Sequence, residues 1–394
     1  MRYAFANCLL DTESYQFRRD GTPVPLEPQV FDLLRYLAEH AGQVVTKDQL
    51  IDTIWGGRIV SEAAISARIS AARAAVGDTG KAQGIIRTIT RRGFELVAPV
   101  EVTGHPPASP APASTSRQTI RYATSLDGSR IAWAVSGSGP PLLRAGHHVT
   151  HLERDWHSSI WRPEFDRLGA AHRLIRFDIR GSGLSDPLTP GSGIDTHVED
   201  MAAVIDAAGL DRFAMIATLQ NTPTAIRYIA ENPGCVTRLV VQCGYVRGRA
   251  RRETAYADPE ADPSIALLRE GWGDPDNGFM RAWLSMFMPG ATREELTEFI
   301  ELLGAASSPD HIAERRRVVD GLYAEDCLDR VTIPTLVIHP RNCVAHPLAE
   351  GQLIARAIPG AELMVIESTN IACMPSEPAW EEQLSATLDF LARD

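Results

Sequence analysis

Cysteine is scarce in this chain and nowhere clustered. The 394 residues include six cysteines, and no two of them stand in a CxxC pair or at another short metal-ligand spacing. Zinc modules and small secreted disulfide domains require such spacing, so the sequence argues against both. Isolated thiols fit a reducing compartment. We therefore expect a cytoplasmic protein that uses no metal ion or other cofactor.

Long apolar runs are missing as well. Asp11 and Glu13 interrupt the N-terminal segment, and no later run approaches the roughly 18 apolar residues that a membrane helix needs. We expect neither an export signal nor a membrane anchor. With 44% apolar and 23% charged residues the composition is that of folded globular protein, and 394 residues predict two or three domains.

The net charge of -11 is unevenly distributed. Residues 1–103 carry 12 basic and 12 acidic side chains, whereas residues 119–394 carry 26 basic and 38 acidic side chains. Within the first part, residues 57–100 hold seven basic and three acidic side chains. A local positive excess on an acidic protein predicts a patch that binds a polyanion.

A stretch rich in proline, alanine and serine separates these two parts. Residues 104–116 cannot build a core, and their prolines favour an extended path of about 3.1 Å per residue. We therefore predict a first domain over 1–103, a linker over 104–118 and a second domain over 119–394.

The first domain has the pattern of a winged helix. Short alternating runs predict a small sheet, and apolar residues at helical spacing then predict three helices, the third beginning after Ser61 and ending at Gly77. Residues 85–97 are rich in β-branched side chains and contain a basic turn, which predicts a hairpin. Helix, turn, helix and basic hairpin are the parts of a winged-helix module.

Spaced motifs across nearly all of residues 1–100 resemble the OmpR/PhoB-type C-terminal effector family. They are Leu26 to Leu34, Val44 to Leu50, Ile54 with Trp55, Ile65 to Asp78, and Ile86 to Phe94. The resemblance implies double-stranded DNA as partner and a homodimer on paired half-sites. The family often carries a receiver domain or a membrane span, and because this chain has the pattern of neither, its input is expected from residues 119–394.

We expect DNA contacts from the third helix and from the hairpin. The residues are Ser66, Ala67, Arg68, Ser70, Arg73, Arg87, Thr88, Arg91 and Arg92. On a helical wheel the face opposite the apolar stripe is small and nearly uncharged, with Arg68 and Arg73 on its flanks. Methyl groups there suit thymine, and arginines suit phosphates, so much of the affinity is expected from the hairpin.

The second domain alternates strands and helices, which predicts an α/β fold with a mostly parallel sheet covered on both sides. A helical insertion at about 248–330 is expected to cover the strand ends, where open α/β sheets bind ligands. The hairpin around Asp127, the segment from Gly137 to Gly146 and the segment from Phe177 to Asp186 resemble the α/β-hydrolase family. The nearest resemblance is to hydrolase-like domains fused to bacterial transcription regulators and nucleotide cyclases.

The hydrolase motifs are kept without their reactive groups. The family places a nucleophile on a tight strand-to-helix turn, and the corresponding position here is Leu219. By the same resemblance the orienting acid corresponds to Cys343 and the histidine to Ile371. A triad needs all three groups together, so we expect no hydrolase activity and a pocket kept for binding.

The pocket is expected to bind a small, largely apolar molecule with one polar end. Backbone N–H groups of His147 and Gln220 are candidates for an oxyanion-hole geometry, and apolar side chains of the insertion are candidates for the walls. The expected ligand-binding residues are Gly146, His147, His148, Thr218, Leu219, Gln220, Trp283, Met286, Phe287, Cys343 and Ile371.

Together these patterns predict a one-component transcriptional regulator with a pseudo-hydrolase sensor. Two alternatives remain open. One is a DNA-tethered hydrolase with an atypical nucleophile such as Cys343 or Thr218. The other is a redox-sensing regulator that uses Cys343 and Cys373. The loop histidines near Gly146 lack tetrahedral ligand spacing, which disfavours a metal site.

Overall fold

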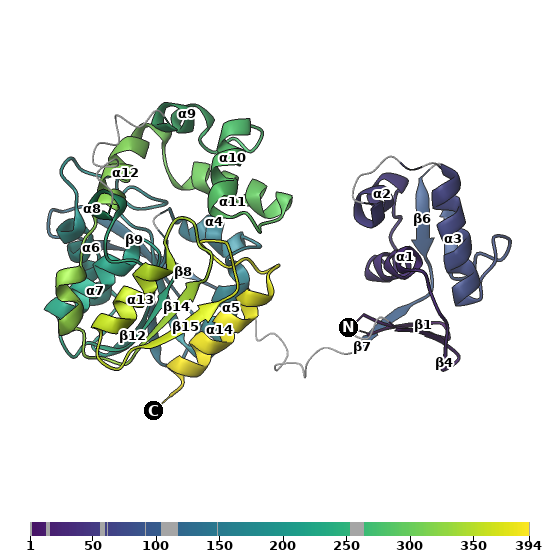
Figure 1. Cartoon of the computed structure of the whole chain (residues 1–394), viewed down its shortest axis with the longest axis horizontal. Coiled ribbons are helices and arrows are strands. Elements are labelled where there is room, and N and C mark those ends of the chain that lie inside the picture. Colours follow the sequence, from purple (N-terminus) through teal and green to yellow (C-terminus); the bar gives the residue numbers. More distant parts are fainter. Residues whose placement is uncertain are drawn as a thin grey trace. The chain divides into compact units, whose positions relative to one another are not determined.

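The chain forms two compact units that divide near residue 113 in a computed structural model (Figure 1). The model describes residues 2–12, 16–55, 60, 62–90, 92–103, 117–147, 149–252 and 264–393. Most of the predicted linker, together with Ser61, Arg91 and His148, lies outside these residues. Each unit is described by itself.

The first unit has the predicted winged-helix architecture. Five antiparallel strands form a sheet in the order β4-β3-β2-β1-β7: β1 Arg2–Phe5, β2 Cys8–Asp11, β3 Gln16–Arg19, β4 Thr22–Pro23 and β7 Val100–Thr103. Three helices follow the first four strands: α1 Pro28–Glu39, α2 Lys47–Trp55 and α3 Glu62–Val76. The hairpin consists of β5 Ile86–Ile89 and β6 Gly93–Leu96.

Apolar stripes on α1 and α3 build the core of this unit. Pro28 stands in the first turn of α1, where its missing N–H costs nothing, and Leu33, Leu34 and Leu37 are fully buried. Ile69 of α3 packs into the same cluster. The periodicity read from the sequence therefore orients both helices correctly, and it leaves the opposite face of α3 exposed.

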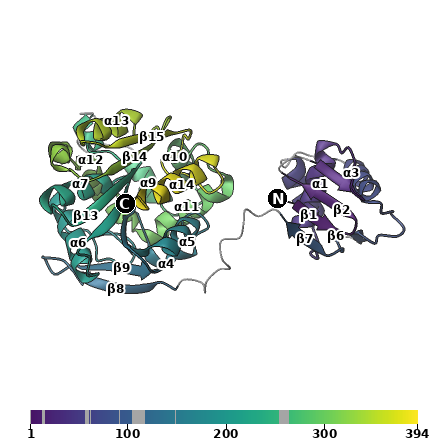
Figure 2. The ribbon, with the colours of Figure 1, turned by 90° about the horizontal axis from the view of Figure 1, so that it is seen from below.

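The second unit is an α/β fold around one eight-stranded sheet, ordered β15-β14-β13-β12-β10-β11-β9-β8 (Figure 2). The strands from β10 to β15 pair in parallel, and β8 and β9 are antiparallel at one edge. Their bounds are β8 Thr119–Thr124, β9 Arg130–Ser136, β10 Pro141–Ala145, β11 Arg173–Phe177, β12 Phe213–Thr218, β13 Val236–Gln242, β14 Thr335–Pro340 and β15 Glu362–Ile366.

Successive residues of the central strands enter two different cores. Leu143 and Met215 pack on the face covered by α6 Ile194–Ala207, α7 Asn221–Glu231 and α13 Leu348–Ala357. Their neighbours Leu142 and Ile216 pack on the other face, against α5 Arg162–Ala171 and α14 Pro378–Leu391. Because both faces are buried, the strands read as continuous apolar runs in the sequence. The fold class predicted from the sequence is confirmed.

Helices cover one end of the sheet. The short α4 Leu152–His157 follows β10, and the long insertion between β13 and β14 forms further helices (Figure 1). These are α8 Arg249–Arg252, α9 Ser264–Gly271, α10 Gly278–Phe287, α11 Arg293–Ala306 and α12 Ile312–Gly321, with 3-10 turns at Pro309–His311 and Glu325–Arg330. Within the described ranges, no helix has the length and apolar character needed to span a bilayer.

Candidate functional site

The exposed face of α3 carries short side chains. Ser66, Ala67, Ser70 and Ala74 are exposed, while Ile65 and Ile69 point into the core. Arg68, at the edge of this face, is ion-paired with Glu27 at 2.7 Å and donates to Gln29 at 3.0 Å. This face carries short, uncharged side chains, as the helical wheel predicted.

Arg73 is placed differently from the sequence expectation. Its side chain is buried, and its guanidinium donates to the Ile86 carbonyl at 2.9 and 3.0 Å and to the Thr88 hydroxyl at 2.8 Å. The expectation that Arg73 reaches a DNA phosphate is therefore corrected. Its position on the flank of the wheel brings it against the hairpin, so it fixes β5 to α3.

Asp78 positions the segment that leads into the hairpin. The Asp78 carboxylate accepts backbone N–H bonds from Thr79, Gly84, Ile85 and Ile86 at 2.7 to 3.1 Å. Burial alone raises the pKa of Asp78, but these N–H groups outweigh it and the pKa is lowered. Asp78 was not among the predicted site residues, although an aspartate just after a helix is a signal for such a turn.

Gly93 is the first residue of the second hairpin strand, and only glycine fits at this position. Its φ is 151°, and a Cβ atom would lie 1.9 Å from the Val45 carbonyl oxygen. Val45 and Phe94 form a β-bridge at this point. The close approach ties the hairpin to the segment that precedes α2.

The tip and outer edge of the hairpin carry the exposed charge. Arg87, Thr88 and Arg92 are exposed, and Arg87 is only loosely paired with Glu95 at 3.9 Å. Arg91, predicted to act with them, lies outside the described residues. Such side chains can contact phosphates without first breaking a strong internal ion pair.

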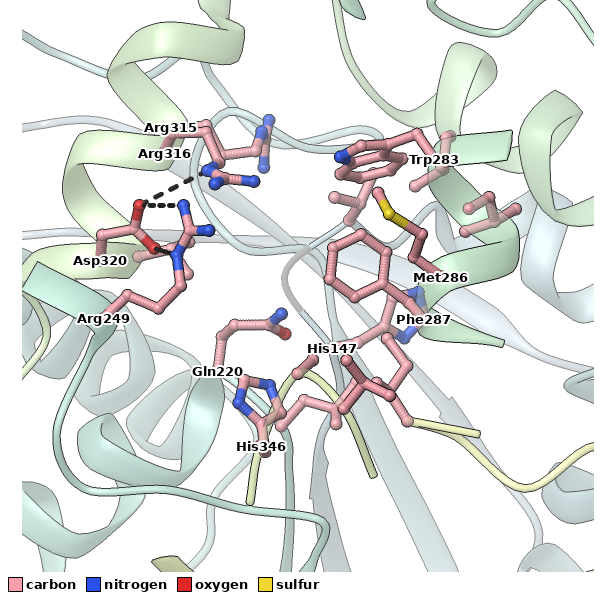
Figure 3. Close-up of a pocket in the computed structure, with 18 of the residues that line it drawn as sticks. His147, Gln220, Arg249, Trp283, Met286, Phe287, Arg315, Arg316, Asp320 and His346 are labelled. Carbon is pink, nitrogen blue, oxygen red and sulfur yellow. Dashed lines mark hydrogen bonds and ion pairs between the residues drawn. The ribbon is translucent and has the colours of Figure 1, made fainter. Parts of the chain in front are cut away.

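A cavity of about 390 Å³ lies in the second unit between the sheet end and the inserted helices (Figure 3). This volume falls within the range typical of small-molecule sites, about 300–1,000 Å³. The apolar lining residues include Leu219, Leu268, Trp272, Trp283, Met286, Phe287, Phe299 and Ile371. The polar lining residues include His147, Gln220, Tyr245, Arg249, Arg252, Arg315, Arg316, Asp320 and His346.

Most of the predicted ligand-binding residues meet at this cavity, and three do not. His147, Leu219, Gln220, Trp283, Met286, Phe287 and Ile371 line it. Gly146 and Thr218 line two much smaller voids, and Cys343 is buried behind Leu219. These three residues are therefore not part of the cavity lining, unlike the sequence expectation. His148 lies outside the described residues.

Leu219 occupies a sharp turn from strand to helix. Its φ of 52° is in the left-handed region that side-chain-bearing residues rarely adopt. The Leu219 N–H donates to the Gln242 carbonyl, and Asn221, the first residue of α7, donates its side-chain amide to the Gly146 carbonyl at 2.6 Å. This strand, turn and helix reproduce the backbone of a nucleophile elbow.

The three positions that the sequence resemblance assigned to a catalytic triad lie together. Leu219 and Cys343 pack in one buried cluster with Cys243, and Ile371 borders it. Cys343 was expected to pair with Cys373, but its Sγ atom lies 3.5 Å from that of Cys243. Cys373 packs in a different buried cluster.

Two buried histidines border the cavity. His147 stacks on Trp161 with ring centroids 4.6 Å apart, and His346 lies 4.6 Å from the Tyr245 ring. Burial, followed by the charge of Arg144, lowers the pKa of His147 to about 3. Burial, followed by the charge of Arg252, lowers the pKa of His346 to about 3. Both imidazoles are neutral near pH 7, so each can donate one hydrogen bond from one ring nitrogen and accept one at the other.

Four arginines and His346 were missed by the sequence analysis. Arg249 and Arg252 come from α8, and Arg315 and Arg316 from α12, about 65 residues later in the chain. The basic run in α8 was the available signal, but nothing local shows that it faces α12. Across the described part of the chain, no three His, Cys, Asp or Glu side chains gather as metal ligands.

Comparison with known proteins identifies the first unit. Residues 21–96 match the family model described as "Transcriptional regulatory protein, C terminal". An 86-residue stretch is 36% identical to the transcriptional activator CadC of Escherichia coli K12. This stretch covers 22% of this chain and 17% of CadC. The chain thus spans about a sixth of the length of this relative and shares one domain with it.

The second unit is similar to hydrolases. A 2-hydroxy-6-oxononadienedioate/2-hydroxy-6-oxononatrienedioate hydrolase of Paraburkholderia phymatum is 24% identical over 265 residues, 64% of this chain and 88% of that protein. The enol-lactonase from Burkholderia xenovorans LB400 superposes with a TM-score of 0.56 at 18% identity, covering 69% of this chain and 100% of that one. The esterase RhEst1 from Rhodococcus sp. ECU1013 superposes with a TM-score of 0.55 at 21% identity, and the match covers 69% of this chain and 98% of that one. The likeness establishes the fold, and both resemblances inferred from the sequence are confirmed.

Proposed function

We propose that this chain, a transcription-regulator DNA-binding domain fused to an α/β-hydrolase-fold domain, is a one-component regulator that senses a small, largely apolar molecule. The second domain is proposed to bind this molecule without hydrolysing it. The observation that carries the proposal is Leu219, which sits in the elbow geometry at the cavity where the hydrolase fold needs a nucleophile.

The chemistry of the three aligned positions supports a binding role. The Leu219 side chain has no atom that can attack a carbonyl, and Ile371 cannot act as a base. Cys343 packs in a buried cluster with Leu219 and is not among the residues that line the cavity. A partly open cavity with a largely apolar surface nevertheless remains, which is the form of a ligand site.

DNA binding is proposed to depend on α3 and the hairpin. Ser66, Ala67 and Ser70 approach base edges, and Arg87, Thr88, Arg91 and Arg92 reach the backbone or the minor groove. Arg68 contributes at the rim of the helix. A homodimer on paired half-sites would double these contacts. Because its partner is DNA, the regulator is proposed to act in the cytoplasm.

Ligand binding can regulate only if it favours one arrangement of the regulator over another. In the proposed scheme the two arrangements are two settings of the dimer that differ in how well they match the half-site spacing. A ligand with equal affinity for both settings would leave the DNA affinity unchanged.

The direct test is binding of the full chain to DNA from upstream of its own coding region. We expect fluorescence anisotropy near 150 mM salt to show affinity at least about tenfold above that for an unrelated fragment of equal length. Arg87→Gln and Arg92→Gln should each weaken binding and reduce its salt dependence. Arg18→Gln, which changes an exposed arginine on β3, is the matched control. Equal affinity for both fragments would contradict the proposal.

A second candidate function is redox sensing. It is favoured by one observation, the 3.5 Å separation of the Cys243 and Cys343 Sγ atoms in the buried cluster beside Leu219. Oxidation by hydrogen peroxide would join the two thiols as a disulfide, with the peroxide reduced to two water molecules. This candidate predicts that peroxide changes the DNA affinity of the wild type and not that of Cys343→Ser.

A further inference from the structure

A second, much smaller void shares Ile371 with the main cavity as a lining residue. Its volume is about 20 Å³, and Arg144, Thr218 and Gln242 line it from the ends of β10, β12 and β13. Trp161, the residue before α5, also lines it. A single water molecule needs roughly 10–15 Å³, so the void has room for one water molecule or one monatomic ion.

Three hydrogen-bond donors on the lining residues of this void have no acceptor. They are Nε of Arg144, Nε1 of Trp161 and Nε2 of Gln242, and none of these atoms makes a hydrogen bond within the described ranges. The three residues are only 4%, 5% and 3% exposed, so bulk water does not pair with them. A buried donor destabilises the folded chain unless something accepts from it. The void is the place where such an acceptor can stand.

Other contacts hold the three side chains in place. Nη2 of Arg144 lies 2.7 Å from the Glu164 carboxylate, and the guanidinium carbon lies 5.6 Å from the centre of the Trp161 ring. The Oε1 atom of Gln242 accepts from the Thr218 hydroxyl at 3.2 Å, which leaves the amide nitrogen for another partner. The donors therefore cannot turn toward a distant acceptor without breaking these contacts.

The donors favour a guest that accepts hydrogen bonds and brings no proton of its own. A water molecule has two lone pairs, so it would leave the third donor unpaired, and its own two protons would need acceptors. A halide ion accepts from three donors at once. Glu164 also lines the void, but its carboxylate is paired with Arg144, so the two charges offset each other.

We propose that this void is a halide site that takes chloride. The ion accepts hydrogen bonds from Nε of Arg144, Nε1 of Trp161 and Nε2 of Gln242. Polyatomic anions such as acetate are too large for a space of about 20 Å³. Trp380 and Gln383 of α14 Pro378–Leu391 line the same void and are only half-buried, so the ion enters beside this helix.

A halide at this place stabilises the turn that carries Leu219. The Gln242 carbonyl accepts from the Leu219 N–H at 3.1 Å, and its side chain accepts from Thr218, the residue before Leu219. An ion that holds the Gln242 amide therefore also holds the ends of β12 and β13. The second unit is expected to gain stability from chloride whether or not the main cavity senses a ligand.

The test compares the stability of the full chain in sodium chloride and in sodium gluconate at equal ionic strength. Urea denaturation is followed by tryptophan fluorescence, because six of the seven tryptophans belong to the second unit. We expect chloride at about 200 mM to lower the unfolding equilibrium constant at least about tenfold, with a response that saturates. Bromide should act like chloride, and acetate like gluconate. Equal stability in chloride and gluconate would overturn the proposal.

Variants of the donors assign the response to this void. Trp161→Phe removes one N–H and keeps an aromatic ring, and Gln242→Met removes the amide at similar length. In each variant chloride should change the unfolding constant by less than about twofold. Each variant is compared with itself in the two salts, so a general loss of stability cancels. A full chloride response in both variants would contradict the site.

Trp133→Phe is the matched control. Nε1 of Trp133 is likewise buried without a partner in the described structure, at 4% residue exposure, but Trp133 does not line the void. This variant should keep the full chloride response, and its loss there would overturn the assignment to the void.

Bromide also locates the site without any variant. Crystals of the full chain grown in sodium bromide should show an anomalous-scattering peak within hydrogen-bonding distance of the Arg144, Trp161 and Gln242 nitrogen atoms. A water molecule at this place, with no anomalous peak, would overturn the proposal even if chloride stabilised the chain by another route.

Discussion

The Sγ atoms of Cys243 and Cys343 lie 3.5 Å apart, one at the end of β13 and the other in the loop after β14. We predict that peroxide treatment joins them as a disulfide, because neighbouring thiols need little movement to react. Peptide mapping by mass spectrometry after alkylation should find this crosslink in the wild type. It should be absent from Cys343→Ser and present in Cys373→Ser. A crosslink between Cys343 and Cys373 would contradict the prediction.

Arg73 is predicted to stabilise the first unit without contributing a phosphate contact. Replacing it in Arg73→Met removes charged hydrogen bonds to the Ile86 carbonyl and the Thr88 hydroxyl, and should lower the free energy of unfolding by about 1.5–3 kcal/mol. Urea denaturation followed by circular dichroism measures this loss.

Arg87→Gln is the matched control for the same hairpin. Arg87 is exposed, so its removal should leave the free energy of unfolding within about 0.5 kcal/mol of the wild type while it weakens DNA binding. If Arg73→Met were as stable as Arg87→Gln, the role of Arg73 in holding the hairpin would be wrong.

His346 is predicted to make the second unit sensitive to acid. Burial holds its folded-state pKa at about 3, while an unfolded histidine titrates near pH 6.5. Above pH 6.5 neither state binds the proton and the group has no effect. As the pH falls below 6.5 the unfolded state gains the proton first, so stability is lost, by about 2 kcal/mol at pH 5 from this group alone.

His346→Gln should remove that contribution. Chemical denaturation gives the free energy of unfolding at pH 7.5 and at pH 5. The loss of this free energy between the two pH values should be smaller in the variant than in the wild type by about 2 kcal/mol. His147 has the same direction of pKa shift, so the variant keeps part of the acid sensitivity. Parallel curves for the wild type and His346→Gln would show that His346 is not buried as a neutral group.

Leu219→Ser is predicted not to create an esterase. The new hydroxyl would stand at the elbow, but Ile371 and Cys343 offer no base and no orienting carboxylate beside it. Assays with p-nitrophenyl acetate should give the same background rate for the wild type and the variant. Turnover by the wild type that disappears in Cys343→Ala or in Thr218→Ala would instead favour the DNA-tethered hydrolase.

The amino-acid pattern alone determined the two folds and the approximate places of their main elements. Apolar spacing on α1 and α3 and the continuous runs of β10 to β14 report which faces are buried, and that is a local property of each segment. The elbow position of Leu219 also followed from the order of strand, turn and helix. Because the carboxyl ends of parallel strands meet at one edge, the grouping of Leu219 with Cys343 and Ile371 could be anticipated as well.

Tertiary packing decided the roles of particular polar side chains. Arg73 looks like a surface residue on a helical wheel, yet the hairpin covers it, and Cys343 finds Cys243 rather than Cys373. Arg252 and Arg316 line the same cavity although more than 60 residues separate them. Periodicity along one segment cannot reveal such contacts, because they depend on how distant segments are held together by the burial of their apolar faces.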